Sequence, residues 1–235
     1  MADTEIKREL LKTINQISLT MKDLIFNEYF DKYGPEQKYC FAMFNEAFQT
    51  FDVFCYAMQH IALGQAGLLL RQVLEQTAIA FILVQHPETL SKFVEHYKLR
   101  KEWVNFKKGE QIKKISERFN VPNNPTALAY LDYGWIGFDD LKKCTEDEML
   151  RYAGFEDILS WRKVYLDKLA HTSFTTIDLA GESYDFPIMN NFIEIACKVF
   201  DYLCCAFHNL TKFDFIFDDK KLFNKFRELY SSYKN

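Results

Sequence analysis

The chain has 235 residues, of which 49% are hydrophobic and 17% aromatic, and its formal net charge at pH 7 is −4. This length suits one domain with a sizeable core, which 23 phenylalanines would fill with large flat side chains. The mild negative charge excludes a global attraction to nucleic acid or to an anionic membrane, and only 5 prolines and 8 glycines argue against a loop-rich β fold.

Spacings of three and four between apolar residues predict amphipathic helices along most of the chain. The first helix is expected over residues 3–26, before the break at Tyr33-Gly34-Pro35. The second helix has an aromatic seam of the kind that packs along a neighbouring helix: Phe41, Phe44, Phe48, Phe51, Cys55 and Met58. We expect this seam to mediate a homodimer.

The most apolar helix is expected over residues 61–85, where His86-Pro87 follows it. It is long enough to cross a bilayer, but four polar residues occupy its centre: Arg71, Gln72, Glu75 and Gln76. Charge is most costly at the middle of a bilayer, so we interpret the segment as a core helix and expect no contact with a membrane.

A long, strongly charged helix is predicted over residues 88–119, with a break near Lys108-Gly109. Its basic residues could contact phosphates, but interleaved glutamates favour a solvated helix face. Residues 121–140 follow, with two prolines and two glycines around Tyr130, Tyr133 and Trp135. This is the only long irregular segment that we expect, and such loops often carry function.

Helices again dominate after residue 140. Thr145 and Glu148 form a capping box before a short helix, and a further helix is expected from about Asp157 to His171. A striped helix near 193–207 and a short C-terminal helix follow. The sequence has no alternating strand pattern and no repeat at a fixed period, so it predicts an all-α fold.

We expect residues 1–235 to form a single-domain bundle of about seven helices. Its core would cover roughly residues 36–212, with an N-terminal helix at 3–26 and a C-terminal helix at 219–231 packed on it. Since the N-terminus is charged and amphipathic, a secretory signal is not predicted.

Six cysteines lie mostly among apolar neighbours on predicted helices, and none forms a C-x-x-C pair: Cys40, Cys55, Cys144, Cys197, Cys204 and Cys205. Without an export signal, we expect reduced, buried thiols in a cytoplasmic protein. The motifs of common metal and nucleotide sites are missing, so we predict neither a metal nor another cofactor.

Arg71 and Glu75 are the most informative pair in the sequence, because ionised groups are rarely buried unless they are paired. They lie four residues apart, share a helix face and can pair directly. Nearby glutamines allow the alternative of an ordinary exposed salt bridge. Apolar residues flank the pair on the same arc, which favours a buried helix that crosses a polar pocket.

His171 could meet this pair from far downstream in the sequence. It ends its predicted helix, and Asp167 lies one turn earlier, where it could orient the imidazole. Taken alone, the histidine is better explained as a cap of the last carbonyls of the helix. We nevertheless expect Arg71, Glu75 and His171 to converge in space.

Three short motifs resemble a bacterial family of uncharacterised all-helical proteins: LLLRQVLEQ, YGWIGF and VYLDKLAHTS. That family has an R-x-x-x-E helix, a Trp-x-Gly loop and a Tyr…His-x-Ser ending. The matching residues, within roughly residues 40–210, are Arg71, Glu75, Trp135, Gly137, Tyr165, His171 and Ser173. The resemblance implies no established activity.

The stretch from Leu166 to His171 is more distantly similar to the motif of HEPN-like helical domains. This similarity implies an up-down helical core. The ribonuclease members use an Arg-polar-x-x-x-His motif, usually at a dimer interface. Here the polar residue and the histidine match, but Leu166 stands at the arginine position. Metal-independent RNA cleavage would therefore need a cation from Arg71 or Lys168.

We expect a binding or regulatory module, without catalytic activity, whose polar pocket holds a small molecule or nucleotide. The expected ligand-binding residues are Arg71, Glu75, Trp135, Tyr165, Asp167, His171 and Ser173. The alternative is an HEPN-like ribonuclease or toxin-type effector in phage defence that binds RNA, with His171 as general acid or base and Arg71 stabilising the transition state. A third class is a structural interaction protein, in which the Arg–Glu pair is a specificity device.

Overall fold

The computed structural model describes residues 3–29, 32–60, 63–102, 108–138, 140–166, 186–211 and 220–234. These ranges hold ten α-helices and no strand, so the fold is all-α, as predicted. The number of helices exceeds the seven or so expected. The difference arises because short helices occupy regions where the sequence predicts one long helix or a loop.

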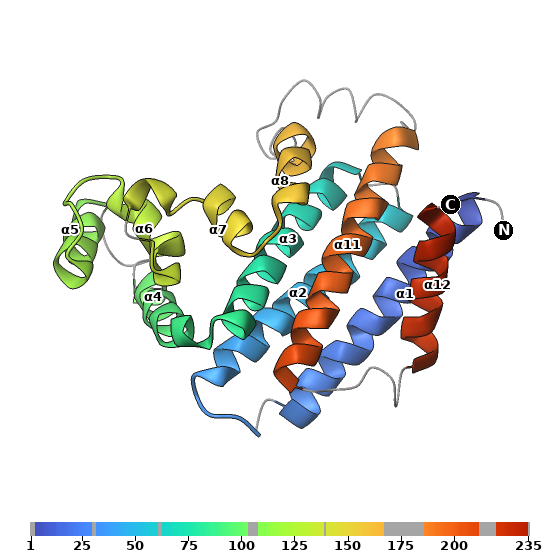
Figure 1. The fold of residues 1–235 in the computed structure, drawn as a ribbon, viewed down its shortest axis with the longest axis horizontal. Coiled ribbons are helices and arrows are strands. Elements are labelled where there is room, and N and C mark those ends of the chain that lie inside the picture. Colours follow the sequence, from blue (N-terminus) through green and yellow to red (C-terminus); the bar gives the residue numbers. More distant parts are fainter. Residues whose placement is uncertain are drawn as a thin grey trace.

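Five long helices form the main bundle (Figure 1): α1 (Asp3–Leu24), α2 (Gln37–Gln59), α3 (Leu63–Gln85), α11 (Phe186–Thr211) and α12 (Lys220–Lys234). α3 packs against α2 and α11, whereas α1 packs against α2 and α12. The two terminal helices therefore lie side by side at one edge of the bundle. α1 continues into a π-helical turn, η1 (Ile25–Tyr29).

The aromatic seam of α2 lies at the centre of this bundle. All six of its residues have 0% exposure because α11 covers them. The ring of Phe207 meets the rings of Phe44 and Phe48 edge to face, with centroids 5.3 and 6.3 Å apart. The prediction that this seam mediates a homodimer is therefore wrong, since the seam is buried within one chain. A homodimer through another surface stays a prediction.

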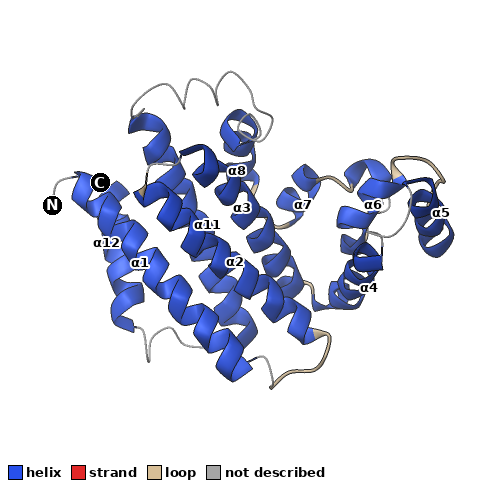
Figure 2. Ribbon diagram, turned by 180° about the vertical axis from the view of Figure 1, so that it is seen from behind, coloured by secondary structure: helices blue, strands red, loops and turns tan. Residues whose placement is uncertain are grey.

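Three helices form an arm that projects from the bundle (Figure 2): α4 (Leu90–Glu102), α5 (Lys108–Phe119) and α6 (Ala127–Tyr133). The 3₁₀ turn η2 (Pro87–Thr89) joins α3 to α4. The arm has a small core of its own, made by Leu99, Ile115, Ala127 and Leu131. α5 begins at Lys108, where the sequence predicts a break in the charged helix.

The segment predicted to be irregular, residues 121–140, is largely helical. It contains α6 and the 3₁₀ turn η4 (Gly134–Ile136). Gly134 packs so closely that a Cβ there would lie 2.6 Å from the Tyr130 ring. Gly137 ends the turn with a φ of 91°, a left-handed conformation that residues with a side chain rarely adopt. The glycines therefore allow tight helical turns here rather than a long loop.

Three further elements follow the arm and lead back toward the bundle: α7 (Glu146–Tyr152), α8 (Glu156–Trp161) and the π-helical turn η6 (Arg162–Leu166), after a 3₁₀ turn, η5 (Leu141–Lys143). Both α7 and η6 pack against α3. Single π-helical turns are rare and frequently occur at functional sites. The centre of α3 thus faces two elements from the second half of the chain.

Within the described residues, α3 is the one helix long and apolar enough to cross a membrane by length and composition. However, 56% of its most apolar window is buried inside the protein, against α2, α11, α7 and η6. This environment is that of a core helix and is compatible with a soluble protein.

Candidate functional site

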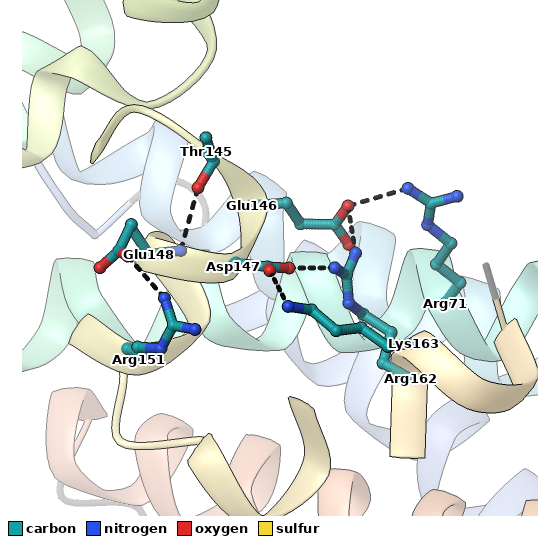
Figure 3. A network of polar contacts seen from close by, with 8 residues as sticks. All are labelled: Arg71, Thr145, Glu146, Asp147, Glu148, Arg151, Arg162 and Lys163. Atoms are coloured by element: carbon teal, nitrogen blue, oxygen red, sulfur yellow. Dashed lines mark hydrogen bonds and ion pairs between the residues drawn. The ribbon is translucent and has the colours of Figure 1, made fainter. Parts of the chain in front are cut away.

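Arg71 lies at one end of a network of charged side chains between α3, α7 and η6 (Figure 3). Its Nη2 atom lies 2.8 Å from Oε2 of Glu146, and 29% of the Arg71 side chain is exposed. The sequence predicts Glu75, one turn along the same helix, as the direct partner. Among the ion pairs of the described residues, Arg71 instead joins the first turn of α7.

Arg162 is a second arginine on the same carboxylate, and only 5% of its side chain is exposed. Its Nη1 atom lies 2.6 Å from Oε2 of Glu146, and its Nη2 atom bonds Asp147. One carboxylate oxygen therefore forms ion pairs with two guanidinium groups. The desolvation of a buried charge is offset only while its partners are present, so the network depends on both acids.

The first turn of α7 presents these two acids to the arginines. Thr145 precedes it with an extended backbone, and its hydroxyl accepts a hydrogen bond from the backbone N–H of Glu148 at 3.3 Å. This confirms the predicted N-cap. The helix dipole also favours acidic residues at this end. The cap sets where α7 begins and thereby places Glu146 and Asp147 opposite α3 and η6.

Asp147 is held in its ionised form by cations on η6. Oδ2 of Asp147 lies 2.5 Å from Nζ of Lys163. Burial opposes ionisation, but the hydrogen bond from Lys163 and the charges of Arg162 and Lys163 outweigh it, so the pKa of Asp147 is lowered. Arg162 therefore keeps this counter-charge at neutral pH.

Glu75 joins α3 to the arm. Its Oε1 atom accepts a hydrogen bond of 2.7 Å from the hydroxyl of Tyr133, at the end of α6. Burial raises the pKa of the Glu75 carboxyl and the charge of Glu146 adds to this rise, whereas the hydrogen bond from Tyr133 opposes it. Glu75 is thus easier to protonate than an exposed glutamate, in a position that links the two parts of the fold.

Trp135 has the surroundings of a core residue. It is 1% exposed and belongs to the main hydrophobic cluster. Its indole N–H donates to the carbonyl of Asp132 at 3.1 Å, and its ring meets Phe93 edge to face at 5.0 Å. Packing at the base of the arm therefore accounts for this side chain without the predicted ligand contact.

The other predicted site residues fall outside the part of the chain that the structure describes. This holds for Asp167, His171 and Ser173, and for the side chain of Tyr165, whose backbone belongs to η6. The convergence of Arg71, Glu75 and His171 therefore stays a prediction.

Glu146, Asp147 and Arg162 are functional candidates that the sequence analysis did not identify. Arg162 is a charge among buried apolar residues, as Arg71 is, since Ile158 and Leu166 on either side of it are fully buried. That pattern could have identified it. Nothing local indicates which acids reach α3, because 75 residues separate Arg71 from Glu146.

One oxygen atom in the network lacks a donor. Oε1 of Glu146 is buried and has no hydrogen-bond partner among the described residues, although Oε2 forms ion pairs with two arginines. Buried polar atoms nearly always have a partner, in the protein or in water. The site can therefore take a hydrogen-bond donor at Glu146 and an anionic group at the exposed edge of Arg71.

No metal site accompanies this network in the described ranges, where no three His, Cys, Asp or Glu side chains cluster suitably. Five of the six cysteines are buried, and burial raises the pKa of the Cys40 thiol to about 12. Such thiols are poor nucleophiles. Comparison with known protein families, curated proteins and solved structures finds no match to this chain.

Proposed function

We propose that the protein is a binding or regulatory module that holds a small polar molecule or nucleotide beside Arg71 and Glu146. The observation that carries the proposal is the buried Oε1 of Glu146, which has no donor among the described residues and lies next to a partly exposed guanidinium group. An amino or hydroxyl group of the ligand would donate to Oε1. A phosphate or carboxylate would bind Arg71, whose planar fork suits both groups.

The position of the network along the chain supports the same proposal. η6 leads directly toward the remaining predicted site residues, with His171 nine residues after Arg162. A ligand bound at Arg71 would lie where α3, α7 and η6 meet. Its binding would therefore stabilise the contact between the bundle and the segment that follows the arm, which is a route to regulation.

Thermal unfolding with chosen probes tests the proposal. We expect ATP, GTP or AMP to raise the melting temperature of the wild type, and inorganic phosphate and adenosine to show which part of the nucleotide is recognised. Arg71→Gln should abolish the shift. Arg151→Gln is the matched control, because Arg151 also lies in the network region but pairs with Glu148 on the exposed side of α7.

The result that would contradict the proposal is equally definite. No shift with any of these probes up to about 1 mM would exclude nucleotide binding in the cellular concentration range. Equal shifts of the melting temperature in the wild type and in Arg71→Gln would show that the probe binds elsewhere on the protein. That outcome would favour the structural alternative, in which the buried ion network only specifies how the helices pack.

The ribonuclease alternative needs a free cation beside His171. Leu166, which stands at the arginine position of the HEPN-like motif, is 0% exposed and belongs to the hydrophobic core. Arg71 and Arg162 both bind Glu146, so either would have to leave a carboxylate to reach a scissile phosphate. These contacts favour binding over cleavage.

A further inference from the structure

A hollow lined by charged and aromatic side chains lies between α11 and α12. Both helices belong to the bundle and stand away from the arm (Figure 1). The volume of the hollow is about 330 Å³, and it is lined by Asp201, Phe226, Arg227, Tyr230, Ser231 and Lys234. It shares no residue with the network around Arg71. The volume lies at the lower end of the range of small-molecule sites.

Two side chains of the hollow have unused hydrogen-bonding capacity. The hydroxyl of Tyr230 is buried and has no hydrogen-bond partner within the described part of the chain. Asp201 forms none of the ion pairs found among those residues, although burial raises the pKa of its carboxyl and the charges of Arg227 and Lys234 oppose that rise. Both residues line the hollow, so a ligand there could supply the missing partners.

Two cationic side chains also line the hollow, and each lies over the face of an aromatic ring. The guanidinium of Arg227 lies 4.8 Å from the centroid of the Phe223 ring, and Nζ of Lys234 lies 4.4 Å from that of Tyr230. The Tyr230 ring in turn stacks on Phe226, with centroids 5.9 Å apart. A cation above a ring face keeps N–H donors for other partners, so both groups remain able to bind an anion.

We infer that this hollow binds a free amino acid with an acidic side chain, of which glutamate is the example. The ammonium group would pair with Asp201, and the two carboxylates would pair with Arg227 and Lys234. The Tyr230 hydroxyl would donate to one of these carboxylates.

The charges of the hollow exclude simpler ligands. Two cations and one carboxylate leave a net positive charge, which a ligand of net charge −1 neutralises group by group. A dicarboxylate without an amino group would leave Asp201 facing an anion. A ligand with an amino group alone would pair with Asp201, but Arg227 and Lys234 would repel it. The arrangement therefore selects a ligand that carries both signs.

Calorimetric titration of the full chain with L-glutamate tests the inference, and glutarate is the matched ligand because it has both carboxylates but no amino group. We expect glutamate to bind and glutarate to bind roughly tenfold to a hundredfold more weakly. Asp201→Asn should weaken glutamate binding by a similar factor. Lys221→Gln, at an exposed position of α12, should leave it unchanged.

A second variant keeps the test independent of folding. Lys234 lies at the exposed end of α12, where a substitution does not disturb the core. Lys234→Gln should therefore weaken glutamate binding without unfolding the protein. No heat of binding with glutamate up to about 10 mM would overturn the inference, since water would then suffice for the Tyr230 hydroxyl. Equal affinity for glutarate and glutamate would overturn it as well.

Discussion

The bundle and the arm are both helical, but different interactions hold them together. In the bundle, helices of 22 to 26 residues surround an aromatic seam, whereas α12 at the edge has 15 residues. In the arm, helices of 13, 12 and 7 residues share a small core and a buried histidine, His96. The difference indicates that apolar burial carries the bundle, while the arm depends on a few polar contacts at its centre and base.

The largest expected effect comes from the seam. Phe207→Ala should lower the free energy of unfolding by about 3–5 kcal/mol, because it leaves a cavity among the rings of Phe41, Phe44 and Phe48. Urea denaturation followed by circular dichroism measures it. Phe26→Ala is the control, since Phe26 is 73% exposed and its loss should change stability by less than about 0.5 kcal/mol. Similar losses for both variants would contradict a bundle held by its seam.

The next largest loss of stability is expected at the ion network between α3, α7 and η6. Glu146→Ala should cost about 3 kcal/mol, because it removes a carboxylate that pairs with the buried guanidinium of Arg162. Glu148→Ala, in the same turn of α7, removes only the exposed pair with Arg151 and should cost less than about 1 kcal/mol. Equal midpoints for the two variants in urea would show that the network is solvated.

Acid should weaken the arm before the bundle. Burial lowers the pKa of His96 to about 4, from an ordinary value of 6.5, and a hydrogen bond to the Leu131 carbonyl only partly opposes this. The unfolded chain binds the proton first, so the contribution of His96 is complete above about pH 6.5 and is lost as the pH falls toward 4. The loss amounts to about 3 kcal/mol.

Hydrogen exchange of the α4, α5 and α6 amides at several pH values measures this loss. In His96→Phe the difference between pH 7 and pH 4.5 should shrink relative to wild type, while amides of α2 respond alike in both proteins. A histidine resonance of His96 that titrates near pH 6.5 would contradict a buried neutral ring.

The difference in helix length between the bundle and the arm also explains which elements the sequence predicts. Long helices repeat their apolar spacing over many turns, so the sequence predicts correctly that the α2 seam packs along another helix and that α3 is a core helix. It is wrong about the partner of the seam, which is α11 of the same chain. α6 has seven residues, which is about two turns and too few for a periodic pattern. The glycines near Trp135 therefore suggested a loop. α7 is equally short, and its capping box rather than its periodicity predicts it.

For the candidate site, the sequence identified charges but not their partners. Arg71 and Glu75 are visible as polar residues within an apolar helix. Their contacts, however, lie 75 and 58 residues away, at Glu146 and Tyr133. Such pairs follow from how the arm returns the chain to α3, and no local spacing encodes that path.

A smaller effect is expected at the contact that links the two regions. Glu75→Leu and Tyr133→Phe should each cost about 1 kcal/mol, because each removes the hydrogen bond between these side chains at the base of the arm. A double-mutant cycle should give a coupling of about 0.5–1 kcal/mol. The cycle of Glu75→Leu with Arg71→Gln should give less. A larger coupling energy between Glu75 and Arg71 than between Glu75 and Tyr133 would instead support the direct Arg71–Glu75 pair that the sequence predicts.

The smallest expected effect is none at all, in an assay for RNA cleavage. We expect no cleavage of single-stranded RNA or tRNA above a His171→Ala control. An HEPN-type ribonuclease needs a cation beside its histidine, and such a donor is commonly worth about 3–4 kcal/mol, or several hundredfold in rate. Leu166 cannot supply it and is buried in the bundle core, while Arg71 and Arg162 are bound to Glu146. Gel analysis of labelled RNA measures the outcome. Cleavage by the wild type that is lost in both His171→Ala and Arg71→Gln, but kept in Arg151→Gln, would show that Arg71 leaves its carboxylate to act on RNA and would make the ribonuclease the leading function.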